Sequence, residues 1–241
     1  MQAIADATTH LAAPGRTDAR ADSAMIGPNA ITRIAEAVEA VEGRSAVVDL
    51  FHLAALDAML AEPPTTMVPE GAVTALQQAL TAKFGAVRAS TLSWIAGQRT
   101  ADYLLAHRIP RRAQALLARL PATLAAHLLL KAVQRHAWTF AGSGQFEVHY
   151  GPQLTLTLQG CPICRGQRAS APVCSYYAGT FERLFRQLVD ANARCTEFAC
   201  EALGAEKCQF RLVWHTRNDS RRAGKEIATN GLKAASIPGS P

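Results

Sequence analysis

All six cysteines of this 241-residue chain lie between positions 161 and 208. Their spacing is C-x2-C-x9-C-x20-C-x4-C-x7-C, and the first 160 residues contain no cysteine. A secreted disulfide scaffold would be smaller and would carry a signal sequence, whereas clustered thiols in a longer chain favour metal or redox chemistry. Any fold for this chain therefore has to account for one cysteine-rich segment near its C-terminal end.

Composition limits the class of protein. Hydrophobic residues make up 49% and charged residues 18%, which is enough apolar surface for a core and excludes a disordered chain. The longest uncharged apolar run, 120–130, has 11 residues, and a membrane-spanning helix needs about 20. The N-terminus lacks the basic and apolar regions of a secretory signal. We therefore expect a cytoplasmic protein and leave a peripheral contact with a membrane open.

The two ends of the chain differ from its middle. Residues 1–24 are rich in Ala, Thr and Asp without apolar periodicity, and residues 216–241 are polar and end in Pro-Gly-Ser-Pro. Both patterns are typical of disordered tails, so we predict one folded domain over residues 25–215. The net charge of +6 is spread along the chain without a basic stripe or interleaved aromatics, which argues against nucleic-acid binding.

The first half of the predicted domain has helical periodicity. Gly27-Pro28-Asn29 is a stop followed by an N-cap, and apolar residues then recur at helical spacing. The most apolar helix is expected over residues 121–135, and we expect it to lie at the centre of the fold. The other expected helices cover residues 31–41, 45–61, 69–80, 86–107 and 110–120.

The periodicity changes after residue 136. Residues 146–150 and 154–158 alternate apolar and polar side chains around Gly151-Pro152, which is the pattern of a β-hairpin. A helix over 177–188 follows, and then a second alternating pair over 196–202 and 207–214. This order predicts an α+β domain, with a helical first half packed on an antiparallel sheet of two hairpins and one long helix between the hairpins.

Three of the cysteines fall where this secondary structure brings side chains together. Cys200 and Cys208 lie on opposite arms of the second hairpin, four residues on either side of Gly204. Cys174 begins the helix between the hairpins, where a helix N-terminus lowers a thiol pKa, and Glu197 precedes Cys200 by three residues. Thiolates suit Zn²⁺, which takes four ligands in a tetrahedron. The alternative is that these cysteines are free thiols packed as small hydrophobic side chains.

The segment Glu197-x2-Cys200-x3-Gly204-x3-Cys208-x-Phe210, with Cys174 upstream, resembles the 4-vinyl reductase domain. This small-molecule-binding domain also occurs in the sensor modules of phenol-responsive transcription activators. The resemblance covers residues 130–215 by motif, and it implies that Gly204 is a turn glycine and Phe210 a core residue. It also implies four ligands for a zinc ion of structural type: Cys174, Glu197, Cys200 and Cys208.

The whole chain, including GCPICRG at 160–166, is similar to the 4-vinyl reductases of bacteriochlorophyll biosynthesis. Within that segment, Cys161 and Cys164 form a C-x-x-C pair, which is either a zinc half-site or a redox pair. The residues Arg165-Gly166-Gln167 argue against the helix that a thioredoxin-type motif needs, and no His follows for c-type haem attachment. Three roles stay open for this pair: redox chemistry, bracing of a loop, or metal binding in a larger assembly.

A vinyl reductase needs a hydride or electron donor, and the sequence shows no motif that would bind one. The nearest match to a dinucleotide-binding loop, Gly142-Ser-Gly144, leads into Phe146 rather than into a helix. No P-loop occurs, and the cysteine spacing does not match a ferredoxin. A zinc with four protein ligands has no open position for catalysis. The sequence therefore leaves open whether the protein is an enzyme, and it favours a binding protein.

A tetrapyrrole carrier needs an apolar cleft, aromatic side chains that stack on the macrocycle, and a His where magnesium is to be ligated. We expect the cleft between residues 90–140 and the strands at 145–158, and we expect His127 to be a hydrogen-bonded core residue. For each single aromatic or His, core packing or solvent exposure is the alternative to a ligand contact. The candidates are Trp94, Tyr103, His107, Trp138, Phe140, His149, Tyr176 and Tyr177.

The residues and the resemblance together predict a protein of bacteriochlorophyll biosynthesis. We expect it to bind or deliver a porphyrin-type, divinyl chlorophyllide-like intermediate at or near the 8-vinyl (4-vinyl) reduction step. The alternatives are the vinyl reductase itself and a small-molecule sensor that acts through a partner protein. The expected partners are the intermediate and other enzymes of the pathway, near the photosynthetic membrane, and a homodimer is left open.

Overall fold

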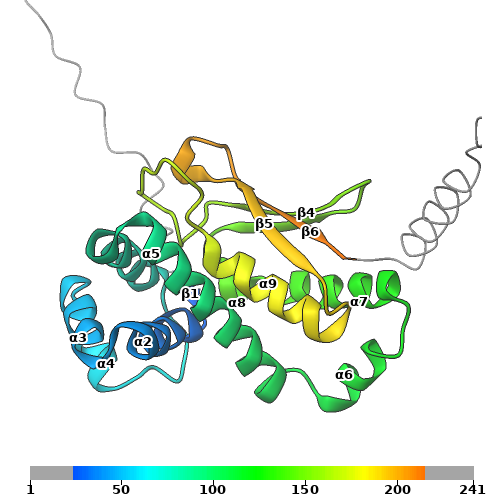
Figure 1. Ribbon diagram of the computed structural model, residues 1–241, viewed down its shortest axis with the longest axis horizontal. Coiled ribbons are helices and arrows are strands. Elements are labelled where there is room, and N and C mark those ends of the chain that lie inside the picture. Colours follow the sequence, from blue (N-terminus) through cyan, green and yellow to red (C-terminus); the bar gives the residue numbers. More distant parts are fainter. Residues whose placement is uncertain (1–23, 215–241) are drawn as a thin grey trace, which may run out of the picture.

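A computed structural model describes residues 24–214 of the chain. The tails expected over residues 1–24 and 216–241 lie outside this range apart from Ala24, and they stay predictions. Within the described range, helices form one side of the molecule and a four-stranded antiparallel sheet forms the other (Figure 1). This is the α+β class that the sequence predicts.

The N-terminal helices begin and end close to the residues expected from the sequence, with one exception. The single helix expected over residues 45–61 is wrong, because the chain leaves helical geometry after Leu53 and Ala55 has a φ of 55°. A non-glycine residue in the left-handed region is uncommon and interrupts the helix there. The elements of this part are β1 (Met25–Ile26), α2 (Asn29–Glu42), α3 (Arg44–Leu53), α4 (Asp57–Ala61) and β2 (Val68–Pro69), with β1 and β2 paired antiparallel.

The longest helix, α5 (Glu70–His107), contains a break at Gly85, where φ is 75° and ψ is 161°. The helices expected over 69–80 and 86–107 are its two segments, and a glycine joins them because it adopts positive φ without strain. Prolines then open the next two helices, since a fixed φ near −65° suits the start of a helix. These helices are α6 (Arg111–Leu117) and α7 (Ala122–Arg135), and the one-turn α8 (Trp138–Ala141) follows.

Both predicted hairpins are confirmed. The strands are β3 (Gln145–His149), β4 (Leu154–Gln159), β5 (Arg194–Ala199) and β6 (Cys208–Val213), and their order in the sheet is β3-β4-β6-β5. The two hairpins join side by side through an antiparallel pairing of β4 with β6. In this pairing Leu158 lies opposite Cys208, so the end of β4 is beside the start of β6.

Helix α9 (Ser175–Leu188) packs against both α5 and β5 (Figure 1). Where α5 and α9 cross, a Cβ added at Gly97 would lie 2.1 Å from the Tyr176 carbonyl oxygen. A Cβ added at Gly179 would lie 2.4 Å from the Trp94 carbonyl oxygen. No side chain fits at these distances, so the two helix backbones are in direct contact.

The expectation that the helix over 121–135 is central is wrong. In α7, Leu124 is 46% exposed and Leu128 is 41% exposed, so only one face of this apolar helix is buried. His127 is also exposed, and its ring contacts Tyr150 with centroids 4.5 Å apart instead of lying in the core. Apolar content alone therefore did not identify the central helices, because it carries no information on which partners a helix finds. Among residues 24–214, no helix combines the length and the apolarity needed to cross a membrane.

Candidate metal centre

Five buried cysteines meet at one end of the sheet, and we call them the cysteine cluster. Cys161 and Cys164 lie in the loop after β4, Cys174 directly precedes α9, Cys200 follows β5, and Cys208 begins β6. Each is at most 1% exposed. The end of β4, the end of β5 and the start of β6 lie at the same edge of the antiparallel sheet, which is why residues far apart in the chain converge here.

The sulfur atoms expected from the resemblance lie at distances that suit one metal ion. The Sγ of Cys174 is 3.6 Å from that of Cys208 and 3.9 Å from that of Cys200, and the Cys200 and Cys208 Sγ atoms are 3.9 Å apart. A tetrahedral zinc with Zn–S bonds of about 2.3 Å separates its sulfur ligands by about 3.8 Å. The three thiols are therefore arranged as ligands of a common ion would be.

Glu197 is the fourth donor of this set. Its Oε2 accepts a hydrogen bond of 2.7 Å from the Cys174 backbone N–H. Its Oε1 is buried and has no hydrogen-bond partner among the described residues. Burial, with the neighbouring Cys200 thiol as a second cause, raises the pKa of the Glu197 carboxyl to about 9. A cation at this place would give Oε1 the partner it lacks, so the residues present fit a metal ion.

The turn between β5 and β6 sets the positions of Cys200 and Cys208. A 3-10 helix, Glu201–Leu203, follows Cys200, and Gly204 then takes the left-handed conformation with φ of 87° and ψ of 9°. The Cys208 Sγ accepts a hydrogen bond of 3.4 Å from the Glu201 N–H. Phe210 is fully buried behind the turn. The turn glycine and the core phenylalanine thus occupy the places that the resemblance implies.

Cys161 and Cys164 also belong to the cysteine cluster, which the sequence did not establish. The Cys161 Sγ lies 3.5 Å from the Cys174 Sγ, and the Cys164 Sγ lies 3.4 Å from the Cys208 Sγ. Burial raises the pKa of the Cys161 thiol, whereas hydrogen bonding from Cys161 holds the pKa of the Cys164 thiol well below its ordinary value. Their sulfur atoms therefore point at the other cysteines, and metal binding is the role among the three open ones that this geometry suits.

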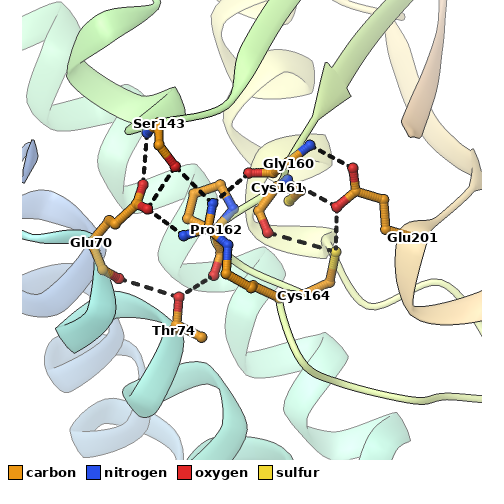
Figure 2. A network of polar contacts seen from close by, with 9 residues as sticks. Glu70, Thr74, Ser143, Gly160, Cys161, Pro162, Cys164 and Glu201 are labelled. Atoms are coloured by element: carbon orange, nitrogen blue, oxygen red, sulfur yellow. Dashed lines mark hydrogen bonds and ion pairs between the residues drawn. The ribbon is translucent and has the colours of Figure 1, made fainter. Parts of the chain in front are cut away.

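The loop that carries Cys161 and Cys164 is fixed on one side by Glu201 (Figure 2). The Glu201 carboxylate accepts hydrogen bonds from the backbone N–H groups of Gly160 and Cys161, at 2.6 and 2.9 Å. Gly160 has a φ of 69°, the conformation that turns the loop out of β4. The carboxylate thus satisfies two loop donors next to the sulfur atoms.

A second carboxylate, Glu70, fixes the same loop to α5 (Figure 2). Glu70 is fully buried, pairs with the Arg165 guanidinium, and accepts hydrogen bonds of 2.7 Å from both the N–H and the O–H of Ser143. Arg165 also donates to the Gly160 carbonyl at 2.8 Å, and the Thr74 hydroxyl donates to the Pro162 carbonyl at 2.7 Å. Sequence reasoning missed Glu70, because an acid in the first turn of a helix ordinarily caps that helix in solvent.

The sixth cysteine, Cys195, lies outside the cluster. It is 7% exposed, and its backbone N–H donates to the Glu182 carboxylate at 3.1 Å. Burial raises the pKa of its thiol. Cys195 is therefore a buried free thiol, as the small-hydrophobic alternative describes.

The eight candidate ligand contacts lie in several different environments. Tyr176 and Tyr177 are buried, and their hydroxyls are bonded to the Thr100 hydroxyl and to the Phe140 carbonyl, each at 2.7 Å. Phe140 packs against Tyr177 with ring centroids 6.0 Å apart. These three side chains are brought together as part of the core.

The other candidates are at or near the surface. Trp138 is 62% exposed, and His149 is exposed beside Thr157 at 3.1 Å. On α5, half-buried Tyr103 stacks on exposed His107 with ring centroids 4.5 Å apart, and the half-buried Trp94 lies one turn before Gly97 at the crossing with α9. The structure therefore does not gather these candidates into one ligand site.

A pocket of about 640 Å³ lies between α5, α6 and the end of α9. None of the strands at 145–158 lines it, so it is not the cleft expected between residues 90–140 and those strands. Its wall combines apolar side chains with charged and carboxamide groups. The lining residues are Asp102, Leu105, Ala106, Arg111, Gln114, Ala115, Ala118, Gln187 and Leu188.

Comparison with known proteins gives matches to both sequence and fold. The family model of the 4-vinyl reductase domain matches residues 154–213, the segment that holds the cysteine cluster. The bacteriochlorophyll synthase 23 kDa chain of Cereibacter sphaeroides is 40% identical over 188 residues, covering 78% of this chain and 90% of its own length. The protein of the same name from Rhodobacter capsulatus is 37% identical over 201 residues, covering 83% of this chain and 91% of its own.

Solved structures share the fold at low sequence identity. A mutant of the Fe(II) unliganded H-NOX protein from K. algicida matches with a TM-score of 0.52 and 15% identity, covering 80% of this chain and 98% of its own. The H-NOX protein without that mutation matches with a TM-score of 0.50 and 14% identity, over 78% and 95%. At this identity the likeness concerns the fold alone.

Proposed function

We propose a function from one premise: this chain belongs to the family of the bacteriochlorophyll synthase 23 kDa chains. Its role is accordingly in bacteriochlorophyll biosynthesis. Within that role, the protein binds a porphyrin-type, divinyl chlorophyllide-like intermediate and delivers it at or near the 8-vinyl reduction step. The observation that carries the proposal is 40% identity over 90% of a relative's length, because it relates whole chains and not a single motif.

The same proposal assigns a structural zinc ion to Cys174, Glu197, Cys200 and Cys208. The sulfur separations of 3.6 to 3.9 Å and the unpartnered Oε1 of Glu197 support it. A zinc with four protein ligands has no open coordination position, so the ion would stabilise this end of the sheet instead of acting on the vinyl group. Binding of the intermediate is then the task of another part of the molecule.

The pocket between α5, α6 and α9 supports the choice of ligand. Its volume of about 640 Å³ is in the range of small-molecule sites, roughly 300–1,000 Å³. Leu105 and Leu188 offer apolar contact to a macrocycle. Arg111 offers a cation to the propionate carboxylate that a porphyrin-type ligand carries, and paired ions of this kind form the stronger hydrogen bonds.

Titration of the full-length protein with divinyl chlorophyllide tests this proposal. A saturable shift of the Soret band is expected, and Arg111→Gln should weaken binding by about tenfold, because a charge-assisted contact is lost. Arg112→Gln is the matched control, since Arg112 is exposed next to the pocket without lining it. Equal affinity of both variants and wild type would move the site away from this pocket, and no spectral shift would remove the binding proposal.

The same samples separate a carrier from an enzyme. Addition of NADPH to the protein and its divinyl ligand should leave the 8-vinyl group unreduced if the protein only binds and delivers. Turnover with no other protein present would instead make it the vinyl reductase. Product analysis by chromatography distinguishes the two results.

A further inference from the structure

We propose that the cysteine cluster holds two divalent metal ions, bridged by the thiolates of Cys174 and Cys208. The second ion uses Cys161 and Cys164, the C-x-x-C pair for which the zinc site described above has no role. The proposal concerns the metal content of the protein and does not depend on the binding of a porphyrin-type ligand.

Residues 24–214 contain two complete sets of four donors, one for each ion. In each set, all four ligand atoms lie within 4.8 Å of one another. The sets share two residues, Cys174 and Cys208, whose Sγ atoms are 3.6 Å apart. Six donors of which two are shared complete two tetrahedra with a common edge. The first set is Cys174, Glu197, Cys200 and Cys208, and the second is Cys161, Cys164, Cys174 and Cys208.

The second set is at least as close-packed as the first. Cys161 and Cys174 have their Sγ atoms 3.5 Å apart, and Cys164 and Cys208 have theirs 3.4 Å apart. These values are close to the separation of about 3.8 Å between sulfur ligands of one tetrahedral zinc. An ion in the first set alone would leave Cys161 and Cys164 unused, although each touches one of its ligands.

The C-x-x-C loop is held in place by two buried or half-buried carboxylates. Glu201 binds two loop N–H groups, and the Arg165 guanidinium is held by the fully buried Glu70 (Figure 2). Buried thiols that pack as small hydrophobic side chains do not require a fixed loop. Metal ligands do, because the groups that orient them set the geometry of the site.

Charge balance points the same way. Five thiolates and one carboxylate carry six negative charges when all of them bind metal, and one divalent ion offsets only two of these. A second divalent ion leaves two, and Arg165, two residues beyond Ile163, supplies a positive charge beside the loop. Each thiol releases its proton to solvent as it binds, so no oxidant or reductant is needed. Sulfur-rich donor sets suit zinc among the common divalent ions.

The test is metal counting on the full-length protein, prepared under reducing conditions without chelator and titrated with zinc alone. Native mass spectrometry and elemental analysis should give two zinc ions per wild-type chain. The double variant Cys161→Ser/Cys164→Ser should bind one, and Cys200→Ser should also bind one. Cys195→Ser is the matched control and should keep two, because Cys195 is buried outside the cluster.

Cobalt titration of the unaltered chain gives a second measurement that does not depend on a variant folding. The thiolate-to-cobalt absorption should rise until two equivalents have been added. One metal ion per wild-type chain in both experiments overturns the proposal. Bound iron with acid-labile sulfide also overturns it, and so does a metal-free chain whose mass is lower by the hydrogens of two disulfides.

Discussion

The α5–α9 crossing and the cysteine cluster are both buried, but different forces hold them together. At the crossing, Gly97 and Gly179 let two helix backbones touch, so packing alone completes that part of the core. At the cluster, five thiols and the Glu197 carboxyl are turned toward one another, and such a group is stable in its ionised form only with a cation. The comparison teaches that one part of this core is complete as polypeptide, whereas the other needs a positive charge that the polypeptide does not supply.

The largest expected effect tests the cluster. Cys208→Ser removes a donor common to both sets, so the protein should lose all its zinc and on the order of 5 kcal/mol of stability, because metal-binding free energy is folding free energy. Elemental analysis and urea unfolding measure the two losses. Cys195→Ser should keep its zinc. A Cys208→Ser protein with unchanged zinc content would show that the cluster is held by packing, as the crossing is.

The crossing is tested by Gly97→Ala. The added methyl meets the Tyr176 carbonyl, and overpacking at a site this tight should cost about 3 kcal/mol. The zinc content should not change. The control is Gly71→Ala, which has open space around its Cβ and should be neutral or stabilising by up to about 1 kcal/mol. If the two variants unfold at the same urea concentration, the backbones are not in contact as described.

A third substitution asks whether the two regions are coupled through α5. Glu70→Gln keeps the shape of the side chain and removes the charge that holds Arg165 and the C-x-x-C loop. Because Arg165 is partly exposed, we expect a loss of about 1–2 kcal/mol. Zinc affinity should fall by about tenfold without any change to a ligand. Competition with a chromophoric chelator measures this fall, and Glu39→Gln, at an exposed ion pair with Arg44, should leave affinity unchanged.

The smallest expected effect concerns the aromatic core beside the crossing. Tyr177→Phe removes the hydrogen bond from the hydroxyl to the Phe140 carbonyl, which should cost about 1 kcal/mol. Zinc content and affinity for divinyl chlorophyllide should stay the same, because the side chain is a core residue in the structure. A weaker affinity for the ligand would return Tyr177 to the group of ligand contacts.

The local parts of the fold and site could be predicted from the sequence. Alternation identifies both hairpins, and the four-residue spacing on either side of Gly204 places Cys200 near Cys208 within one turn. Adding Cys174 and Glu197 required the family resemblance, and the structure does bring them to the same place. Patterns of this kind succeed because each depends on residues close together in the chain.

The parts that failed depend on long-range pairing. Nothing in the alternation says that β4 lies beside β6, and that pairing is what carries Cys161 and Cys164 to the other sulfur atoms. The partnership of Glu70 with Arg165 spans 95 residues and leaves no periodic signal. The prominence of α5 and α9 over the more apolar α7 depends likewise on contacts that a single sequence does not reveal.

The different sequence separations of the six donors also set an order of events during folding. Glu197, Cys200 and Cys208 lie within one hairpin, and closing a short loop costs little chain entropy. This hairpin can therefore capture an ion early, while Cys161 and Cys164 reach it only after β4 docks on β6. The first ion then acts as a template for the rest of the sheet, and uptake of the second marks the moment at which the molecule has finished folding.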